Sequence, residues 1–278
     1  MPQKYLPVDG LATLVHHRGA TSLPGHAPPR ANGEVVLCLH DAGDNGASFA
    51  DLLDALAADH TPIAYDRPGH GRSASLDSLG SIAAMVTHLR GLAGACGAEH
   101  PVLVGEGLGG ALALAAAAAD PAWPLAVVLV GVLTPANLAQ QIAELTAITQ
   151  GKARRAFDNT GYAPDTPRQV YQKAFAEWVR TDPRATVGDR RAQSDWAASA
   201  PSTAVAAVTC PVVIVVGEHE DADAVAAAES LAASLTNANV TIQRLAGAGR
   251  HGPLEAPAAL ATVIDGAVSA LAAGRASR

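Results

Sequence analysis

The sequence contains few aromatic residues and no excess of basic ones. Phe, Trp and Tyr make up 4% of the 278 residues, and 26 acidic side chains outnumber 19 basic ones, for a formal net charge of −7. Proteins that bind nucleic acid need a basic surface to neutralise phosphates, so we expect no nucleic-acid partner. Apolar residues account for 49% of the chain, which excludes low-complexity disorder and allows a large buried core.

Long hydrophobic runs and closely spaced cysteines are also missing. The longest apolar stretches, 111–119 and 124–133, are well below the ~20 residues that a membrane-spanning helix needs. The first residues, MPQKYLPVDG, lack the basic region and apolar core of a secretory signal. Cys38, Cys96 and Cys210 are far apart in apolar surroundings, so we expect reduced, buried thiols. These features predict a cytoplasmic protein with no membrane partner.

Short β-branched runs alternate with longer alanine-rich stretches along the chain. This alternation is typical of an α/β fold, in which helices cover a mostly parallel sheet. We expect strands at 11–16, 35–40, 62–66, 102–105, 126–132, 212–217 and 239–245. We expect helices at 47–58, 78–95, 108–119, 222–235 and 255–273.

Residues 134–206 interrupt this alternation, because they contain helical polar sequence and no strand pattern. We expect them to form a helical cap, while 1–133 and 207–278 form the core domain. Six of the aromatic residues lie in this segment: Phe157, Tyr162, Tyr171, Phe175, Trp178 and Trp196. The spacing of Tyr171, Phe175 and Trp178 puts them on one helix face. Either they pack the cap onto the core or, with Trp196, they bind a flat substrate.

Several segments resemble motifs of the α/β-hydrolase superfamily. VVLCLHDAG (35–43) is a strand running into a turn, with Asp41 where the family has Gly, and YDRPGHGRS (65–73) matches the family's D-x-P-G-x-G-x-S turn. VLVGEGLGGALAL (102–114) has the strand, sharp turn and helix of the nucleophile elbow. PVVIVVGEHED (211–221) and LAGAGRHGPLEAP (245–257) resemble the segments that deliver the catalytic acid and histidine. The resemblance implies a capped α/β-hydrolase fold with an eight-stranded, mostly parallel sheet.

Two of the three catalytic positions implied by this resemblance hold other residues. The elbow pattern G-x-S-x-G has Gly107 at the nucleophile position, which therefore stands vacant. Arg250 occupies the position of the histidine, and a guanidinium that is always protonated cannot act as a general base. Only the acid position has a suitable residue, Glu220. We therefore expect no Ser-His-Asp hydrolase.

Other residues at these turns are candidates for a role in the chemistry. His251 directly follows Arg250, and a slip of one residue would bring it into the site as a base. Glu106 precedes the elbow position and is expected to make a structural contact. The run GEGLGG (105–110) also fits G-x-G-x-x-G, but the following strand lacks the acidic residue of a dinucleotide site. The acidic run 218–223 lacks metal-ligand spacing. We therefore expect no cofactor and no metal.

The resemblance also implies an oxyanion hole, whose donors would be the backbone N–H groups of Leu108 and Ala42. We expect Arg250 to pair with Glu220, as the family's histidine pairs with its acid, and to place a cation near this hole. His40 and Asp41, in the turn after a strand, are candidates for substrate contact. Such a site would bind a carboxylate, phenolate or enolate without covalent catalysis.

These residues favour a non-hydrolytic enzyme of the α/β-hydrolase fold, acting on an aromatic or anionic small molecule. Its reaction would be a cyclisation, an elimination, C–C bond formation or cofactor-free oxygenation. The alanine-rich composition resembles that of high-GC actinobacterial proteins, among which tailoring enzymes of polyketide biosynthesis are common. One alternative is a hydrolase of an ester, lactone or epoxide that activates water with His251 or Glu220. Another is a non-catalytic protein that binds a small molecule, and we also allow for a homodimer.

Overall fold

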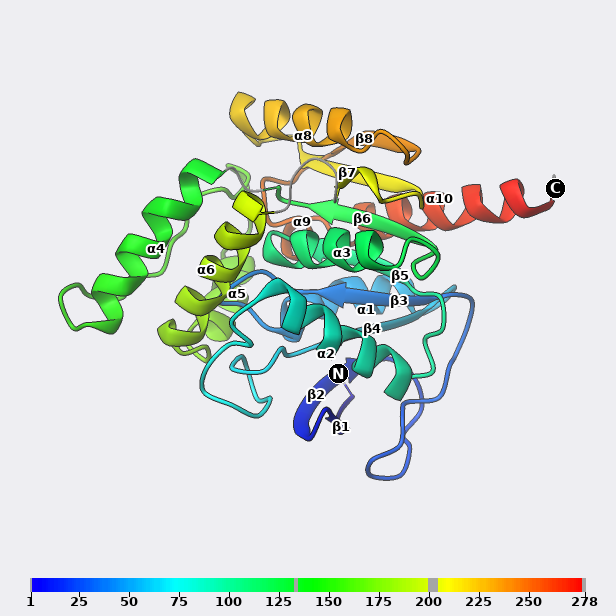
Figure 1. The fold of residues 1–278 in the computed structure, drawn as a ribbon, viewed down its shortest axis with the longest axis horizontal. Helices are drawn as coiled ribbons and strands as arrows, with labels where there is room; N and C mark the ends of the chain where they lie inside the picture. Colours follow the sequence, from blue (N-terminus) through cyan, green and yellow to red (C-terminus); the bar gives the residue numbers. More distant parts are fainter. Residues whose placement is uncertain (1, 133–134, 200–204, 277–278) are drawn as a thin grey trace.

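An eight-stranded sheet forms the centre of the molecule (Figure 1). The computed structural model describes residues 2–132, 135–199 and 205–276. The strands follow the order β1-β2-β4-β3-β5-β6-β7-β8, and all neighbours from β4 to β8 are parallel. Their bounds are β1 Gln3–Val8, β2 Leu11–His17, β3 Val35–Leu39, β4 Thr61–Tyr65, β5 Val102–Glu106, β6 Ala126–Val130, β7 Val212–Gly217 and β8 Val240–Leu245. The predicted α/β class with a mostly parallel sheet is confirmed.

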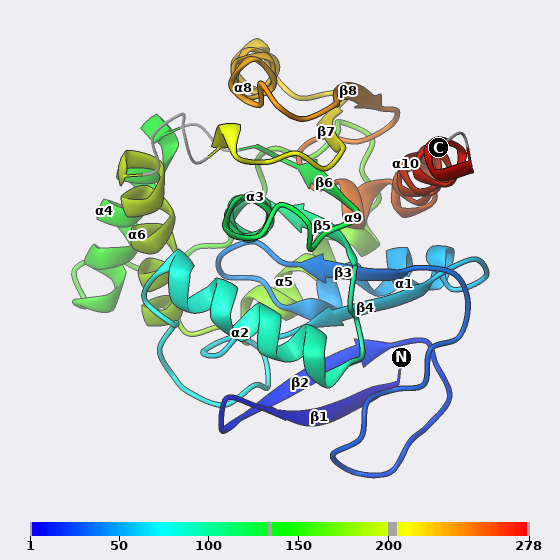
Figure 2. The same ribbon diagram turned by 45° about the vertical axis from the view of Figure 1, so that its right-hand side comes forward.

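Helices cover both faces of the sheet, as Figure 2 shows. The helices α2 (Ile82–Ala95), α3 (Leu108–Ala119) and α8 (Ala222–Ser234) pack on one face. On the other face lie α1 (Ala50–Leu56) and α10 (Pro257–Ala276). Successive residues of a strand point to opposite faces of the sheet, and each face has its own hydrophobic core. Leu37 and Leu39 belong to one core, and Val36 and Cys38 belong to the other. Both faces are apolar, which explains the continuous hydrophobic runs in these strands.

The structure differs from the sequence-based elements mainly at turns and edges. The first strand was missed, because Pro7 and the polar residues around it resemble a loop. Proline is tolerated there because β1 is an edge strand. The expected helix 78–95 begins only at Ile82, where the Ser81 side chain caps it. The expected helix 47–58 is a 3-10 turn, η1 (Gly46–Phe49), followed by α1, and Pro257 separates the short α9 (Gly252–Glu255) from α10.

Three helices lie between β6 and β7 in the chain, grouped at the left of Figure 1. They are α4 (Pro135–Thr149), α5 (Arg168–Trp178) and α6 (Pro183–Ser199), and we call them the cap helices. Within 135–199 the structure contains no strand, as the sequence predicted. The expected boundary between residues 133 and 134 lies outside the described residues.

The three cysteines are free and buried, as predicted. Burial raises the pKa of the Cys96 thiol to about 12 and that of Cys210 to about 11, so these thiols stay protonated at neutral pH. Among the described residues, no helix has both the length and the apolar character needed to cross a membrane.

Candidate active site

A glycine makes the sharp turn between β5 and α3. β5 ends at Glu106 and α3 begins at Leu108, so Gly107 alone reverses the chain between them. Its φ of 52° and ψ of −111° are accessible to glycine and strained for other residues. The N–H of Leu108 lies in the first turn of α3, where a helix provides no partner for it. The turn therefore presents a backbone donor that the helix itself leaves unpaired, and no side chain.

The carboxylate of Asp41 occupies the space beside Gly107. A Cβ atom on Gly107 would lie 2.2 Å from Asp41 Oδ1 and 2.4 Å from its Cγ. The Leu108 N–H donates a hydrogen bond of 2.7 Å to the same Oδ1. We expected a vacant nucleophile position and a Leu108 N–H free for an oxyanion, but Asp41 fills the first and binds the second. It reaches this point because it lies two residues after the end of β3, which neighbours β5.

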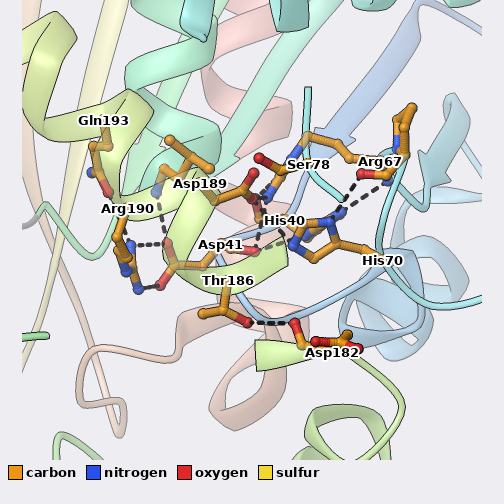
Figure 3. A network of polar contacts seen from close by, with 12 residues as sticks. His40, Asp41, Arg67, His70, Ser78, Asp182, Thr186, Asp189, Arg190 and Gln193 are labelled. Carbon is orange, nitrogen blue, oxygen red and sulfur yellow. Dashed lines mark hydrogen bonds and ion pairs between the residues drawn. The ribbon is translucent and has the colours of Figure 1, made fainter. Parts of the chain in front are cut away.

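Two arginines hold this carboxylate, Arg250 and the cap residue Arg190; Figure 3 shows Arg190 beside Asp41. Arg190 of α6 donates from Nη1 to Asp41 Oδ1 and from Nη2 to Oδ2, both at 2.7 Å. Arg250 Nη2 lies 3.3 Å from Oδ2. Burial by itself raises the pKa of Asp41, but the charge and hydrogen bonds of Arg190 outweigh it and hold the pKa well below its usual range. We call Asp41, Leu108, Arg190 and Arg250 the Asp41 clamp.

The expected pairing of Arg250 with Glu220 does not occur among the described residues. Glu220 turns back on its own loop, where its Oε2 accepts a hydrogen bond of 2.7 Å from the Gly217 N–H. Burial raises the pKa of Glu220. Arg250 binds Asp41 instead, because the missing side chain at Gly107 lets that carboxylate come within its reach. Arg250 lies at the predicted position, but its partner comes from a different strand.

His251 lies beside Glu106 and stacks on an aromatic ring of the cap segment. Its Nδ1 is 3.5 Å from Glu106 Oε1, and its ring lies 4.3 Å from that of Tyr162 at an interplanar angle of 29°. Burial lowers the pKa of His251, but the Glu106 carboxylate raises it more, so the net pKa lies above its ordinary value. Glu106 is only 3% exposed, and neither of its carboxylate oxygens has a hydrogen-bond partner. His251 therefore lies where it can act as the base that the sequence allowed if its loop slipped by one residue.

A third carboxyl group, Asp44, lies near this pair. Burial and the negative charges of Glu106 and Asp41 raise its pKa to about 7. Asp44 and His251 line a cavity of about 230 Å³ between the sheet and the cap, which we call the polar cavity. Its wall includes Asp41, Ala42, Asp44, Tyr162, Trp178, Arg190, Arg250 and His251. Carboxyl, imidazole and guanidinium groups thus line one cavity, a combination typical of acid–base catalysis.

The D-x-P-G turn fastens the cap to the core. Arg67 of this turn donates to Asp189 Oδ2 of α6 at 2.6 Å, and His70 Nε2 lies 3.2 Å from the same oxygen (Figure 3). Arg67 also donates to the backbone carbonyls of His40 and Asp41. His40 is fully buried, with Nδ1 bonded to Asp41 O and Nε2 accepting from Arg67 N–H. His40 therefore supports the turn that carries Asp41, and it lines neither the polar cavity nor a cavity described below.

The predicted aromatic face of α5 is divided between packing and cavity walls. Trp178 lines the polar cavity and carries the Arg155 guanidinium 3.9 Å from its ring. Phe175 is 48% exposed and contacts Trp178 at 5.7 Å between ring centroids. Tyr171 packs on Tyr162 at 4.6 Å. Trp196 lines a separate cavity beyond the Asp41 clamp. Sequence spacing therefore predicted the shared face, but not which rings face a cavity.

Three residues of this site were not singled out as functional from the sequence. Arg190 is one of two adjacent arginines in α6, and nothing in the local sequence distinguishes it from its neighbour. Asp44 lies in a turn with no motif, and Glu106 was expected to be structural. Among residues 2–132, 135–199 and 205–276, no three His, Cys, Asp or Glu side chains are grouped as a metal site requires.

Comparison with known sequences identifies relatives of different lengths. Over 282 aligned residues the chain is 30% identical to polyketide synthase ThaQ of Burkholderia thailandensis, in an alignment that covers 92% of this chain and 13% of ThaQ. The matches to curated relatives span between 13% and 42% of those proteins' own lengths.

Solved structures with the same fold extend over nearly the whole chain. An esterase from Exiguobacterium antarcticum superposes with a TM-score of 0.77 at 15% identity, covering 96% of this chain and 99% of the esterase. The enol-lactonase of Burkholderia xenovorans gives a TM-score of 0.74 at 17% identity, with coverage of 95% and 99%. Residues 36–263 match the family model described as the alpha/beta hydrolase family. By its sequence motifs, its sheet and this match, the chain belongs to the α/β-hydrolase family.

Proposed function

We propose that this protein is a non-hydrolytic, cofactor-independent enzyme that transfers protons to and from a small-molecule substrate in the polar cavity. The observation that carries this proposal is the pairing of His251 with the buried Glu106, while Asp41 occupies the position beside Gly107 and the Leu108 N–H. A base is thus available in the cavity, whereas the parts needed for an acyl-enzyme are not.

The Asp41 clamp argues against a covalent mechanism. A glycine at position 107 has no nucleophile to form an ester intermediate, and Arg250 cannot accept a proton. An oxyanion would also have to compete with Asp41 for the Leu108 N–H, and Asp41 is held there by four hydrogen bonds from three residues. The clamp therefore replaces the expected oxyanion hole with a permanently bound internal anion.

Within this proposal, each remaining group has a distinct role. His251 takes a proton from a carbon or hydroxyl of the substrate, and Glu106 stabilises the imidazolium that results. Arg250 faces the same cavity and uses one side-chain hydrogen bond on Asp41, so its other N–H groups are available for the negative oxygen left on the substrate. Asp44, with a pKa of about 7, can return a proton to the product. Cyclisation, elimination, C–C bond formation and cofactor-free oxygenation all begin with such a carbanion, enolate or phenolate.

Two observations support an aromatic or polyketide-like substrate. Tyr162 and Trp178 line the polar cavity beside the basic groups, where they would provide an aromatic wall for a flat substrate. The similarity to polyketide synthase ThaQ extends over 92% of this chain, which favours a role in natural-product biosynthesis. In this enzyme, residues 134–206 would form the cap that supplies this specificity, and residues 1–133 and 207–278 the core.

Proton transfer can be tested without knowing the natural substrate. The protein is incubated in D2O with acetophenone, whose methyl protons exchange slowly, and deuterium uptake is followed by mass spectrometry. We expect catalysed exchange that His251→Ala reduces by ~10²–10⁴-fold, the usual contribution of a general base. The exposed His219→Ala is the matched control and should leave exchange unchanged.

Hydrolysis of 4-nitrophenyl acetate is measured in parallel. If the wild type hydrolyses this ester by a route that His251→Ala abolishes, and catalyses no exchange, the protein is a water-activating hydrolase and the proposal is wrong. If ketones raise its melting temperature but undergo neither reaction, it is a binding protein, which equally contradicts the proposal.

A further inference from the structure

A second cavity lies between α3, α8 and the cap helices α4 and α6. Its volume is about 420 Å³, and we call it the apolar cavity. In the described part of the chain it shares no lining residue with the polar cavity. No charged side chain lines it, and most of its wall is aliphatic or aromatic: Leu114, Leu129, Val130, Leu138, Trp196 and Leu231. Its size is in the range of small-molecule sites.

One buried amide provides this cavity with a hydrogen-bond donor. Gln193 is 5% exposed and lines the apolar cavity, whereas Arg190, one turn earlier on α6, lines the polar cavity. Gln193 Oε1 accepts a hydrogen bond of 2.9 Å from Arg190 Nη1. Because a guanidinium can only donate, the oxygen of the amide must face Arg190, and this fixes the direction of the Nε2 group.

The Nε2 group itself lacks a partner. Among the described residues it makes no hydrogen bond, although the side chain as a whole is only 5% exposed; Figure 3 shows Gln193 beside Arg190. Gln193 lines the apolar cavity, so an oxygen atom brought to its Nε2 group would gain a hydrogen bond, usually worth ~0.5–1.5 kcal/mol. Arg190 of the Asp41 clamp thus holds the oxygen of the Gln193 amide, and the N–H group of the same amide is left for the apolar cavity.

We propose that the apolar cavity binds a neutral, hydrophobic molecule that carries one hydrogen-bond acceptor, such as a ketone or lactone carbonyl, which accepts from Gln193 Nε2. The walls exclude a charged ligand, because no side chain lining the cavity could compensate its loss of hydration. Exposed Ser230 of α8 marks the side from which such a molecule enters. This site is separate from His251 and does not depend on the proton-transfer chemistry proposed above.

Binding of two matched probes tests this site. The probes are 2-acetylnaphthalene, which has a carbonyl acceptor, and 2-ethylnaphthalene, which has nearly the same shape without one; their affinities are measured by calorimetry. Filling the cavity with Ala227→Phe should weaken both probes at least tenfold. Ala226→Phe changes the neighbouring exposed residue of α8, which does not line the cavity, and should weaken neither. Melting temperatures confirm that both variants are folded.

The donor is tested by Gln193→Glu, which keeps an acceptor for Arg190 and removes the N–H group. We expect the affinity for 2-acetylnaphthalene to fall by about threefold to tenfold, the value of one hydrogen bond, and that for 2-ethylnaphthalene to stay within about twofold. Three results would overturn the proposal: no binding of 2-acetylnaphthalene, binding that Ala227→Phe leaves intact, or an equal loss of both probes in Gln193→Glu.

Discussion

Two buried carboxylates in the same site have opposite surroundings. Both oxygens of Asp41 accept hydrogen bonds, and Arg190 binds them in a bidentate manner. Glu106 is just as buried, yet among the described residues its oxygens have no hydrogen-bond partner, and His251 Nδ1 lies 3.5 Å from Oε1. The number of donors, not the depth of burial, separates the two.

This difference determines what each group can do. The pKa of Asp41 is well below its usual range because its arginine partners outweigh burial, so it remains an anion at any working pH. Near Glu106 the pKa values are raised instead of lowered: that of Asp44 is raised to about 7, and that of His251 lies above its ordinary value. The Asp41 clamp is therefore a structural ion pair, and the groups around Glu106 are the ones that can exchange protons near neutrality.

The largest effect is expected from breaking the Asp41 clamp. Arg190→Leu leaves Asp41 buried with only Leu108 and Arg250 as donors, and should lower the free energy of unfolding by ~3–5 kcal/mol, measured by urea denaturation. The adjacent, exposed Arg191→Leu is the control and should change stability by less than ~0.5 kcal/mol. Equal stability of the two variants would mean that the clamp does not hold the cap to the core.

A smaller effect is expected from adding a side chain at Gly107. Gly107→Ala should cost ~1–3 kcal/mol, because its Cβ meets Asp41 and its backbone is strained. In an Asp41→Gly, Arg190→Leu background only the strain remains, so the same substitution should cost clearly less; the thermodynamic cycle is measured by urea denaturation. An identical cost in both backgrounds would show that Asp41 does not occupy this space. By the same reasoning, a serine at position 107 needs the removal of Asp41 before it can react.

The smallest effect in free energy, but the most specific, is expected from Glu106→Gln. Its carboxylate raises the pKa of His251, so His251 contributes stability that is fully present below its unfolded pKa of about 6.5 and is lost as pH rises through its folded pKa. Without that charge the pKa of His251 should fall, and this pH-dependent contribution should disappear. The imidazole titration is followed by NMR, with the exposed Glu99→Gln as control. An unchanged titration would refute the assignment of Glu106 as the partner of His251.

Local patterns predicted much of the fold and less of the site. Helix α3 and strand β7 have the bounds expected from the sequence, because alanine-rich and β-branched runs determine their own conformation. The predicted pairing of Arg250 with Glu220 was wrong. Glu220 and Asp41 both follow strands of the sheet, and only their distances from Arg250 in the folded protein decide which of them it binds. The role of Arg190 could not be predicted, because the rotation of α6 alone distinguishes it from Arg191.

The sequence by itself determined the α/β-hydrolase fold, the glycine in the turn after β5, and the presence of Arg250 in the loop that follows β8. These features depend on which residue types occur at fixed spacings, and such spacings can be read from a single sequence. The tertiary structure alone decided what fills the space at Gly107 and which acid pairs with which base. The reason is physical: Asp41, Arg190 and Arg250 are distant in the sequence. Only the fold brings the turn after β3, helix α6 and the loop before α9 together, so that their charges lie within hydrogen-bond distance.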